Sequence, residues 1–428
     1  MTKPSLMHHI SRRALLGSAA AGVTMFGPFR HVRVRAQDKP IKIGLTHDAS
    51  GQFANSGQSE QRGTMMAIDE FNANGGVLGR QIEYVWMDTE TTPQTGTRVA
   101  ERMINRENVH FMIGALQSGV ANAISQVCQQ YGCIYFNTNS SSPSEAAENC
   151  HRTKFVWDGN GENFSRAAAK SAIETFGENW FLIYNDYVWG QDTNEATKEV
   201  ASEYGATVMD EVPVPVGTRD FSPILLRIQQ EKPDVVAAAV GGDDFKVMRQ
   251  QVNDMGLARS PAWLNNQQDW PDVYGLPKDN LFGVFGTTWY YDLDLPGVDE
   301  FVARYQEMYP DTAMRVPGNV FYNGYWATRA LLEAVERAGT TNNHAVIREL
   351  EQLRMSAEER MQHHDAYMNP ATHQVQQTIY LATANLESED ENDLFQILSN
   401  TSPEEVADSA AESACVLESF EDTPVYEP

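Results

Sequence analysis

Imidazole and carboxylate side chains are most concentrated late in the chain, at His363, His364 and Asp365, with His373 close behind. Side chains of these types bind transition metals in proteins. Neighbouring residues of a strand point to opposite faces, however, so His363 and His364 would reach one ion only across a turn. We therefore interpret the group as part of a surface loop, with a metal-dependent periplasmic enzyme built on these histidines as the alternative.

Local signatures of catalysis are missing elsewhere in the sequence. It contains no G-x-S-x-G, no H-E-x-x-H, no Walker loop and no G-x-G-x-x-G after the first predicted strand. These are the usual local signs of hydrolysis, metalloenzyme chemistry and nucleotide binding. We expect a protein that is not an enzyme and has no catalytic residue, no metal and no cofactor.

The four cysteines allow three pairings. Cys128 and Cys133 lie at a predicted helix-to-strand junction, Cys150 lies in the next loop, and Cys415 is near the end of the sequence. We expect a disulfide between Cys150 and Cys415, which would hold the tail in place, and a second between Cys128 and Cys133. A bond between Cys133 and Cys150 is the main competitor.

The charge balance disfavours whole classes of partner. The 428 residues include 32 Lys and Arg against 58 Asp and Glu, a formal net charge of −26, which would repel phosphate backbones and anionic membranes. No apolar run of about 18 residues is present that could span a bilayer. The sequence therefore predicts a globular protein that does not bind nucleic acid.

The segment 1–36 is typical of an export signal. Ser11-Arg12-Arg13 precedes a short apolar stretch from Ala14 to Phe26 and a small-residue cleavage site near Ala36, as in twin-arginine signals. We expect this segment to be removed and the mature protein to reside in the periplasm, where disulfides form.

Strand and helix patterns alternate along the rest of the sequence. Short strands are predicted at 41–46, 81–88, 110–113 and 134–137 with helices between them, and a second series of the same kind begins after residue 155. This alternation implies parallel sheets covered by helices. Beyond Arg360 the sequence has no Lys or Arg, so we expect an acidic tail on the surface.

Several short motifs follow one another in a distinctive order over nearly the whole mature chain. They are Lys42-Ile43-Gly44-Leu45, Ser50-Gly51-Gln52-Phe53-Ala54, Asn74-Gly75-Gly76-Val77-Leu78-Gly79-Arg80, Phe111-Met112-Ile113-Gly114-Ala115, Asn185-Asp186-Tyr187-Val188-Trp189-Gly190 and Lys232-Pro233-Asp234-Val235-Val236. In this order they resemble the periplasmic solute-binding proteins of ABC transporters, in particular the leucine/isoleucine/valine-binding (branched-chain amino acid) family.

The resemblance implies an α/β fold of the type I periplasmic-binding-protein kind, with two lobes joined by three crossovers. Each lobe would be a parallel sheet flanked by helices. Lobe I would comprise 37–156 and 288–355, and lobe II would comprise 157–287 and 356–428 with the acidic tail. The crossovers would fall near 155–157, 286–288 and 355–361. Ligands of open α/β sheets bind beyond the carboxyl ends of the strands, where helix N-termini present free N–H groups.

The same resemblance identifies candidate ligand-binding residues in lobe I. Ser118 matches the family's ligand loop after the third strand, and Asn139, Ser140 and Ser141 match the loop after the fourth. A serine at the start of a helix also caps that helix. Ser118 and Ser140 could therefore bind ligand, cap a helix, or do both.

Lobe II departs from the amino-acid binders of the family, which carry a tyrosine and then a glutamate after successive strands. Here those positions fall at Gly241-Gly242 and near Gln267-Gln268. An ammonium group would lack its strongest partner, so we do not expect a branched-chain amino acid. Asp243, Asp244 or Asp269 could supply the missing charge, although Asp243 and Asp244 more often cap the helix that they begin.

Aromatic residues are numerous where the cleft is expected. The candidate ligand-binding residues therefore include Phe53, Trp157, Trp189, Trp289 and Gln267. Trp270 and Tyr290 are also expected near the cleft. Aromatic faces suit an amino-acid derivative, an amide, an aromatic acid or an amine. The lack of Arg in the predicted cleft loops disfavours a dianion.

These patterns together predict a monomeric receptor that captures a small organic ligand between two lobes and delivers it to a membrane ABC permease. A ligand-sensing component of a signalling system is a further alternative, which the sequence does not separate from transport.

Overall fold

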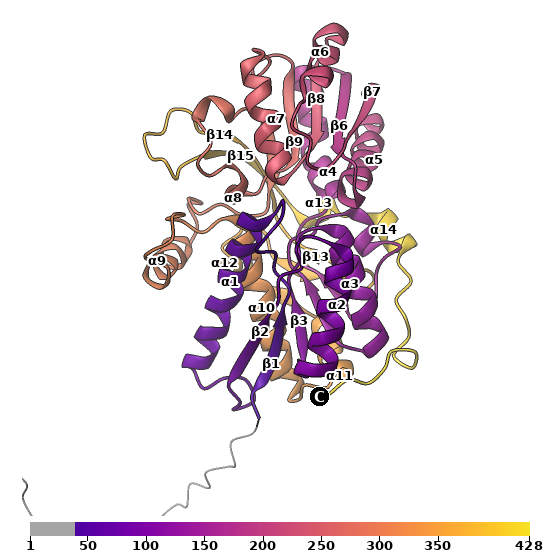
Figure 1. Cartoon of the computed structure of the whole chain (residues 1–428), viewed down its shortest axis with the longest axis vertical. Helices are drawn as coiled ribbons and strands as arrows, with labels where there is room; N and C mark the ends of the chain where they lie inside the picture. Colours follow the sequence, from indigo (N-terminus) through magenta and orange to yellow (C-terminus); the bar gives the residue numbers. More distant parts are fainter. Residues whose placement is uncertain (1–38) are drawn as a thin grey trace, which may run out of the picture. The chain divides into compact units, whose positions relative to one another are not determined.

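The computed structural model describes residues 39–428, and the expected signal segment 1–36 lies outside them. Two sheets flanked by helices form the two lobes of Figure 1, as the resemblance implies. None of the helices in the described part of the chain is long and apolar enough to cross a membrane.

Lobe I is built on a five-stranded sheet in the order β2-β1-β3-β4-β5, in which every pairing is parallel. Its strands are β1 (Ile41–Leu45), β2 (Ile82–Trp86), β3 (Phe111–Ile113), β4 (Ile134–Asn137) and β5 (Lys154–Val156). The last three are buried along their whole length. Continuous burial of this kind is typical of a parallel sheet covered on both faces.

The helices of lobe I come from both halves of the chain. They are α1 (Ala54–Ala73), α2 (Pro93–Arg102), the π-helical turn η1 (Met103–Glu107), α3 (Ser118–Tyr131), the 3-10 turn η2 (Pro143–Ala146), α9 (Val298–Met308), α10 (Asn319–Ala338) and α11 (Asn343–Leu350). Gly63 lets α1 lie directly against α10, because a Cβ there would be 2.0 Å from the carbonyl oxygen of Phe321.

Lobe II is built on a seven-stranded sheet in the order β15-β14-β10-β9-β8-β6-β7. Its strands are β6 (Asn179–Asn185), β7 (Thr207–Val214), β8 (Val235–Ala239), β9 (Ala262–Gln267), β10 (Val284–Thr287), β14 (Ile379–Ala384) and β15 (Phe395–Thr401). The first five are parallel, whereas β14 and β15 are added antiparallel. The accompanying helices are α4 (Gly161–Phe176), α5 (Val188–Glu203), α6 (Ser222–Glu231), α7 (Gly242–Asp254), α8 (Trp270–Val273), the 3-10 turn η3 (Lys278–Asn280) and α13 (Pro403–Val406). The short helix α14 (Ser409–Ala414) contacts η2 of lobe I.

The crossovers between the lobes lie side by side, but the third comes later in the chain than expected. Residues 354–376 form a small sheet of their own, β11 (Arg354–Met355), β12 (Ala366–Met368) and β13 (Val375–Gln376), with the single-turn helix α12 (Ala357–Arg360) between its first two strands. The third crossover therefore joins β13 to β14 rather than falling at 355–361. Gln377 on this crossover donates to the carbonyl oxygen of Trp157 on the first, at 2.8 Å.

The C-terminal tail does not stay with lobe II, which corrects the expected assignment of 356–428. After β15 and α13 the chain returns to lobe I, where the disulfide between Cys150 and Cys415 fixes it as predicted. Tyr426 then donates through its hydroxyl to the carbonyl oxygen of Val109 at 2.6 Å. Figure 1 shows the C-terminus beside α11.

The expected disulfide between Cys128 and Cys133 was wrong, as was the competing bond between Cys133 and Cys150. Cys128 and Cys133 are free thiols buried in the core of lobe I. The Sγ of Cys128 contacts the sulfur of Met112 at 3.6 Å, and the Sγ of Cys133 faces backbone carbonyl oxygens. Both behave as small apolar side chains of the core.

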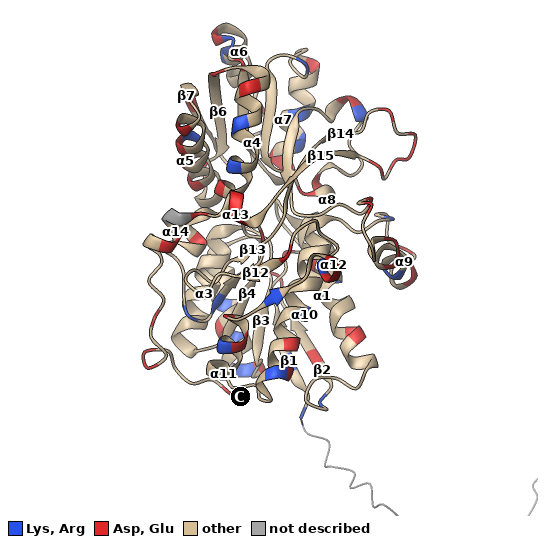
Figure 2. Ribbon diagram, turned by 180° about the vertical axis from the view of Figure 1, so that it is seen from behind, with Lys and Arg blue, Asp and Glu red and all other residues tan. Residues whose placement is uncertain are grey.

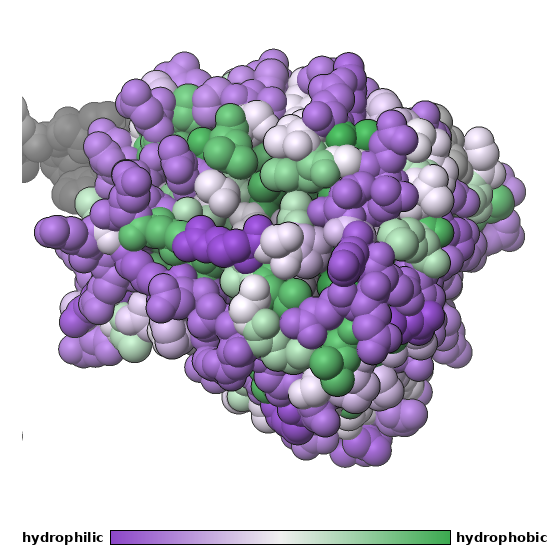
Figure 3. All heavy atoms as spheres, turned by 90° about the horizontal axis from the view of Figure 1, so that it is seen from above, coloured by the Kyte–Doolittle hydropathy of each residue, from purple (hydrophilic) through white to green (hydrophobic). Residues whose placement is uncertain are grey.

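The surface is polar and acidic. Figure 2 shows acidic residues on helices and loops of both lobes, and in Figure 3 apolar residues form separate patches between hydrophilic ones. This distribution agrees with the acidic composition.

Candidate functional site

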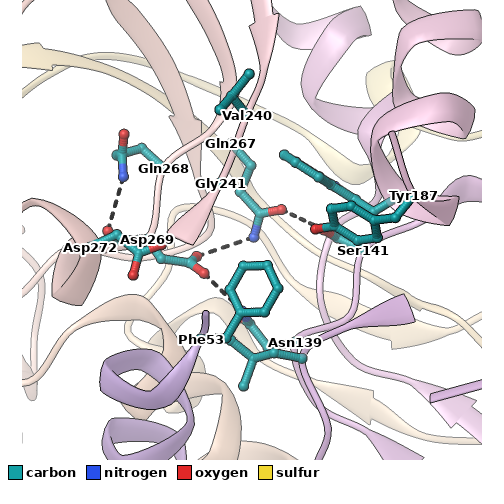
Figure 4. A pocket seen from close by; sticks show the side chains of 12 residues that line it. Phe53, Asn139, Ser141, Tyr187, Val240, Gly241, Gln267, Gln268, Asp269 and Asp272 are labelled. Atoms are coloured by element: carbon teal, nitrogen blue, oxygen red, sulfur yellow. Dashed lines mark hydrogen bonds between the residues drawn. The ribbon is translucent and has the colours of Figure 1, made fainter. Parts of the chain in front are cut away.

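A pocket lies between the lobes, beyond the carboxyl ends of the strands of both sheets (Figure 4). Lobe I supplies residues that begin α1 or follow β3 and β4: Phe53, Leu116, Asn139 and Ser141. Lobe II supplies residues that follow β6, β8 and β9: Tyr187, Trp189, Val240, Gly241, Gln267, Gln268, Asp269 and Asp272. Both lobes thus contribute to one pocket at the carboxyl ends of their strands, where open α/β sheets usually bind ligands.

Hydrogen bonds join the two lobes around this pocket. Asn139 donates from Nδ2 to Asp269 Oδ2 at 3.0 Å, and the Ser141 hydroxyl donates to Gln267 Oε1 at 2.5 Å. Beside them, Ser56 donates to Asp272 Oδ1 at 3.1 Å. The lobes are therefore closed on each other in this structure.

Glycine permits this close approach at one further contact. Gln52 of lobe I donates from Nε2 to the carbonyl oxygen of Gly241 at 2.9 Å. The next residue, Gly242, has a φ of +60°, and a Cβ there would lie 2.5 Å from the Gln52 side chain. A larger residue at this position would keep the lobes apart.

Two carboxyl groups line the pocket, the buried Asp272 and the partly buried Asp269. Asp269 accepts from Asn319 Nδ2 at 2.7 Å and Gln267 Nε2 at 3.3 Å, in addition to Asn139. Burial raises the pKa of Asp269, and burial followed by the charge of Asp269 raises the pKa of Asp272 to about 7. The hydrogen-bond donors to both carboxyls are neutral side chains, while the charge of Lys246 acts on Asp272 from outside the pocket lining. A positive charge beside Asp269 would be favoured.

Three aromatic rings form the adjoining wall. The ring centroids of Phe53 and Tyr187 are 6.3 Å apart, and those of Tyr187 and Trp189 are 6.0 Å apart. Tilted rings at these separations pack favourably against one another and present apolar faces.

Ser118 and Ser140 do not line the pocket but lie beneath it. Their hydroxyl oxygens are 2.8 Å apart, and Ser140 donates to the buried carboxylate of Glu145. Glu145 in turn pairs with Lys154 at 2.8 Å, with both side chains fully buried. These serines therefore belong to a polar network that supports the loop carrying Asn139 and Ser141.

The network also fixes the shape of that loop. Asn137, the last residue of β4, accepts from the backbone N–H of Ser140 at 2.9 Å and donates back to its carbonyl oxygen at 2.9 Å. The same amide donates to Glu145 at 2.6 Å. Buried side chains thus hold Asn139 and Ser141 toward lobe II.

Trp157 and Trp289 pack in the core and do not line the pocket. The guanidinium of the buried Arg360 lies 5.2 Å from the ring centroid of Trp157, and Trp289 stacks on Tyr322 with centroids 4.8 Å apart. Both lie on crossover segments. Their aromatic character stabilises the hinge region by packing.

The histidine group of the alternative interpretation is dispersed. His363 contacts the hydroxyl of Tyr380, His364 the side chain of Asn400, and His373 the carboxylate of Glu351. Within residues 39–428, no group of three or more His, Cys, Asp or Glu side chains is arranged to hold a metal ion.

Leu116, Tyr187, Val240 and Asp272 line the pocket without having been singled out from the sequence. Tyr187 stands in the motif that also contains Trp189, and Asp272 lies one helical turn after Asp269. Spacing of three residues places two side chains on one face of a helical turn, which was a usable signal for Asp272.

An α/β protein whose two lobes close over a pocket at the carboxyl ends of both sheets belongs to the class of bilobed solute-binding proteins. The comparison with known families agrees, because residues 40–391 match the model of the family described as periplasmic binding protein. The chain belongs to this family.

Individual relatives have low sequence identity to the chain but align with most of its length. The chain is 25% identical to Leu/Ile/Val-binding protein BraC3 of Rhizobium johnstonii over 326 residues, which cover 74% of this chain and 83% of the relative. It is 27% identical to Leu/Ile/Val-binding protein homolog 7 of Brucella suis over 316 residues, or 69% of this chain and 77% of the relative.

Solved structures share the fold. A periplasmic binding protein from Burkholderia mallei superposes with a TM-score of 0.80 at 21% identity, covering 87% of this chain and 97% of the other. An ABC transporter solute-binding protein from Rhodopseudomonas palustris BisB5, in complex with 3,4-dihydroxybenzoic acid, superposes with a TM-score of 0.76 at 19% identity. The match covers 86% of this chain and 98% of the other.

Proposed function

We propose that the protein is an extracytoplasmic receptor that captures a small organic solute between its lobes and delivers it, unchanged, to a membrane ABC permease. Membership of the periplasmic binding protein family supports this role. The observation that carries it is the pocket itself, which is lined by both lobes and closed by hydrogen bonds that cross between them.

Five of the residues expected from the sequence are the proposed ligand contacts: Phe53, Asn139, Ser141, Trp189 and Gln267. The aromatic faces of Phe53 and Trp189 would pack on the solute. The amides and hydroxyl would exchange their hydrogen bonds across the cleft for bonds to it. Binding energy released only when both lobes touch the solute favours the closed state over the open one.

We also propose that the lobes move about the crossovers near 157, 288 and 377, and that the segment 1–36 directs export to the periplasm by the twin-arginine route. Proteins of this mechanical type act by hinge closure around the ligand. The export proposal is tested by replacing Arg12 and Arg13 with Lys, which should leave the protein in the cytoplasm.

Closure is tested with a pair of glycine variants. Gly242→Ala places a Cβ against Gln52 and should hold the lobes apart, whereas Gly256→Ala has the same kind of backbone, with φ of +71°, but nothing within 4 Å of its Cβ. The solute is first found by a thermal-shift screen of amino acids, amides, aromatic acids, polyamines and betaines, because a ligand bound only by the native state raises Tm.

X-ray scattering of the pure protein should then show compaction with solute for the wild type and Gly256→Ala, and little or none for Gly242→Ala, which should also bind more weakly. Equal compaction and affinity in both variants would contradict the closure mechanism. Chemical conversion of the solute by the pure protein would contradict the receptor role.

A further inference from the structure

We propose that the pocket is selective for a small organic cation that carries no carboxylate group, with its positively charged nitrogen placed between Asp269 and Asp272. This inference rests on the proposed receptor function and specifies the class of solute. It separates this protein from receptors whose solutes carry a carboxylate.

The pocket is lined by acids and by no base. Asp272 is buried and Asp269 is partly buried, and no Lys, Arg or His is among the described residues that line it. Lys246 of α7 is outside the lining; it pairs with Asp243 at 3.3 Å, and its positive charge also acts on Asp272 but not on Asp269. A buried carboxylate without a cationic partner is costly, and a cationic solute would supply that partner.

Further acids surround the pocket at depth. Asp158 is fully buried and is bound by Gln267 at 2.6 Å and Asn323 at 3.0 Å. Glu60 is fully buried as well, with the imidazole of His47 3.9 Å away and neither carboxylate oxygen hydrogen-bonded. Burial raises the pKa of both carboxyl groups, and a nearby cation would favour their ionised form whereas a nearby anion would oppose it.

The start of α3, where the resemblance places a ligand loop at Ser118, is occupied by the protein's own groups. The N-terminus of α3 is capped by Gln117, whose Oε1 accepts from the N–H of Val120 at 2.8 Å. The hydroxyls of Ser118 and Ser140 are bound to each other and to Glu145. A carboxylate at this point would find neither serine hydroxyl available, because both serines are fully buried and do not line the pocket.

The remaining lining suits the organic part of such a cation. Phe53, Tyr187 and Trp189 present a continuous aromatic wall next to the two carboxyls. Aromatic faces attract organic cations through their quadrupoles and also bury apolar groups. The combination of acids and aromatic faces fits an amine or a quaternary ammonium compound.

A matched series of solutes tests this selectivity. Benzylamine and benzyltrimethylammonium carry a positive charge, benzamide is neutral and benzoate is negative, while the ring is the same. These four are measured by thermal shift and calorimetry alongside a panel of small aliphatic cations, neutral amides, carboxylates and zwitterionic amino acids. We expect the tightest binders to be cations, and carboxylates to bind at least tenfold more weakly than cations of equal size.

Variants then locate the charge. Asp269→Asn and Asp272→Asn should each weaken binding of the best cation about 30-fold or more, the effect of removing one member of a buried charge pair. Asp254→Asn removes an exposed acid at the other end of α7, where it accepts from Gln250 at 2.8 Å, and should leave affinity unchanged. Circular dichroism and urea unfolding confirm that each variant is folded.

The outcomes separate the two proposals. A carboxylate or zwitterion as the tightest binder, or full cation affinity in Asp269→Asn and Asp272→Asn, overturns the cation inference and leaves the receptor function standing. Failure of every solute in the panel to bind would count against the receptor function itself, and the cation inference would fall with it.

Discussion

The buried pair of Glu145 and Lys154 offers a sharp test of how the binding loop is supported. The Lys154 ammonium is 2.8 Å from Glu145, and the two side chains are 1% and 0% exposed. For unit charges at that distance, Coulomb attraction is about 6 kcal/mol at an effective dielectric constant of about 20. Desolvation costs several kcal/mol for each ion.

The directions of the pKa shifts indicate that burial outweighs attraction. Burial raises the pKa of Glu145 despite Lys154, and burial lowers the pKa of Lys154 despite Glu145. The cost of burying the two charges therefore offsets their attraction, and the intact pair adds little net stability. One partner alone would be a buried charge without compensation. We expect Lys154→Met to lower the free energy of unfolding by about 3–5 kcal/mol, and Glu145→Gln combined with Lys154→Met to recover most of that loss.

Urea unfolding near pH 7 measures this cycle, and Lys198→Met is the matched control. Lys198 pairs with Glu195 at the same 2.8 Å, but the two side chains are 33% and 57% exposed. An exposed pair contributes about 0–1 kcal/mol, so the control should change little. Equal losses in Lys154→Met and Lys198→Met, or a double variant that loses as much as the sum of its singles, would refute the reasoning.

Three further predictions concern the tail, the pocket acids and the aromatic wall. Cys415→Ser opens a disulfide that spans 265 residues and should lower stability by up to roughly 5 kcal/mol on the loop-entropy estimate; an unchanged urea midpoint without reductant would contradict this. Because burial raises the pKa of Asp272 from 3.8 to about 7, the folded protein keeps a proton that the unfolded chain loses, so stability without solute should fall as pH rises from about 4 to 7. Asp272→Asn should flatten that part of a Tm-against-pH curve, and an identical slope would be inconsistent with the shift. Trp189→Ala should weaken solute binding at least tenfold while Trp189→Phe keeps most of it, since a face and not the indole N–H is the proposed contact; calorimetry in which both lose equally would point to the N–H instead.

The fold was largely predictable because most of its strands are short apolar runs between helices, several of which end at a glycine, as α3 does at Gly132 and α10 at Gly339. The strand expected at 134–137 is β4 itself, Ile134–Asn137. The segment after Ser356 was harder, since β12 and β13 have only three and two residues. Strands of that length carry almost no periodic signal. The small sheet that they form was not predicted, and the third crossover therefore lies between β13 and β14, later in the chain than expected.

The position of the candidate pocket was more predictable than the orientation of the side chains around it. Asn139, Ser141 and Gln267 follow strands at the switch between the lobes, and the structure places them in the pocket. Ser118 follows a strand in the same way, yet Glu145 and Ser140 engage its hydroxyl. Sequence spacing identifies the loop on which a side chain lies, but a partner distant in the chain decides which way that side chain turns.

The cysteines illustrate the same limit. Cys128 and Cys133 are close in sequence and separated by a turn at Gly132, which has a φ of +79°. Proximity made a disulfide reasonable, but the two thiols fill the core between α3 and β4, where Cys128 contacts Met112. The long-range bond of Cys415 was easier to predict, because an otherwise unanchored acidic segment needs a tether.

Because the tail returns to lobe I, both β1 and the last residues of the chain belong to the same lobe. Fluorophores attached near β1 and near the C-terminus would keep a constant separation, so the energy transfer between them would not change when solute binds. A donor at Val425 in the tail and an acceptor at Val216 in lobe II, which are 67% and 52% exposed, would instead lie on different lobes. The proposed closure would change the distance between them. The path of the tail thus determines where an optical reporter of this receptor has to be placed.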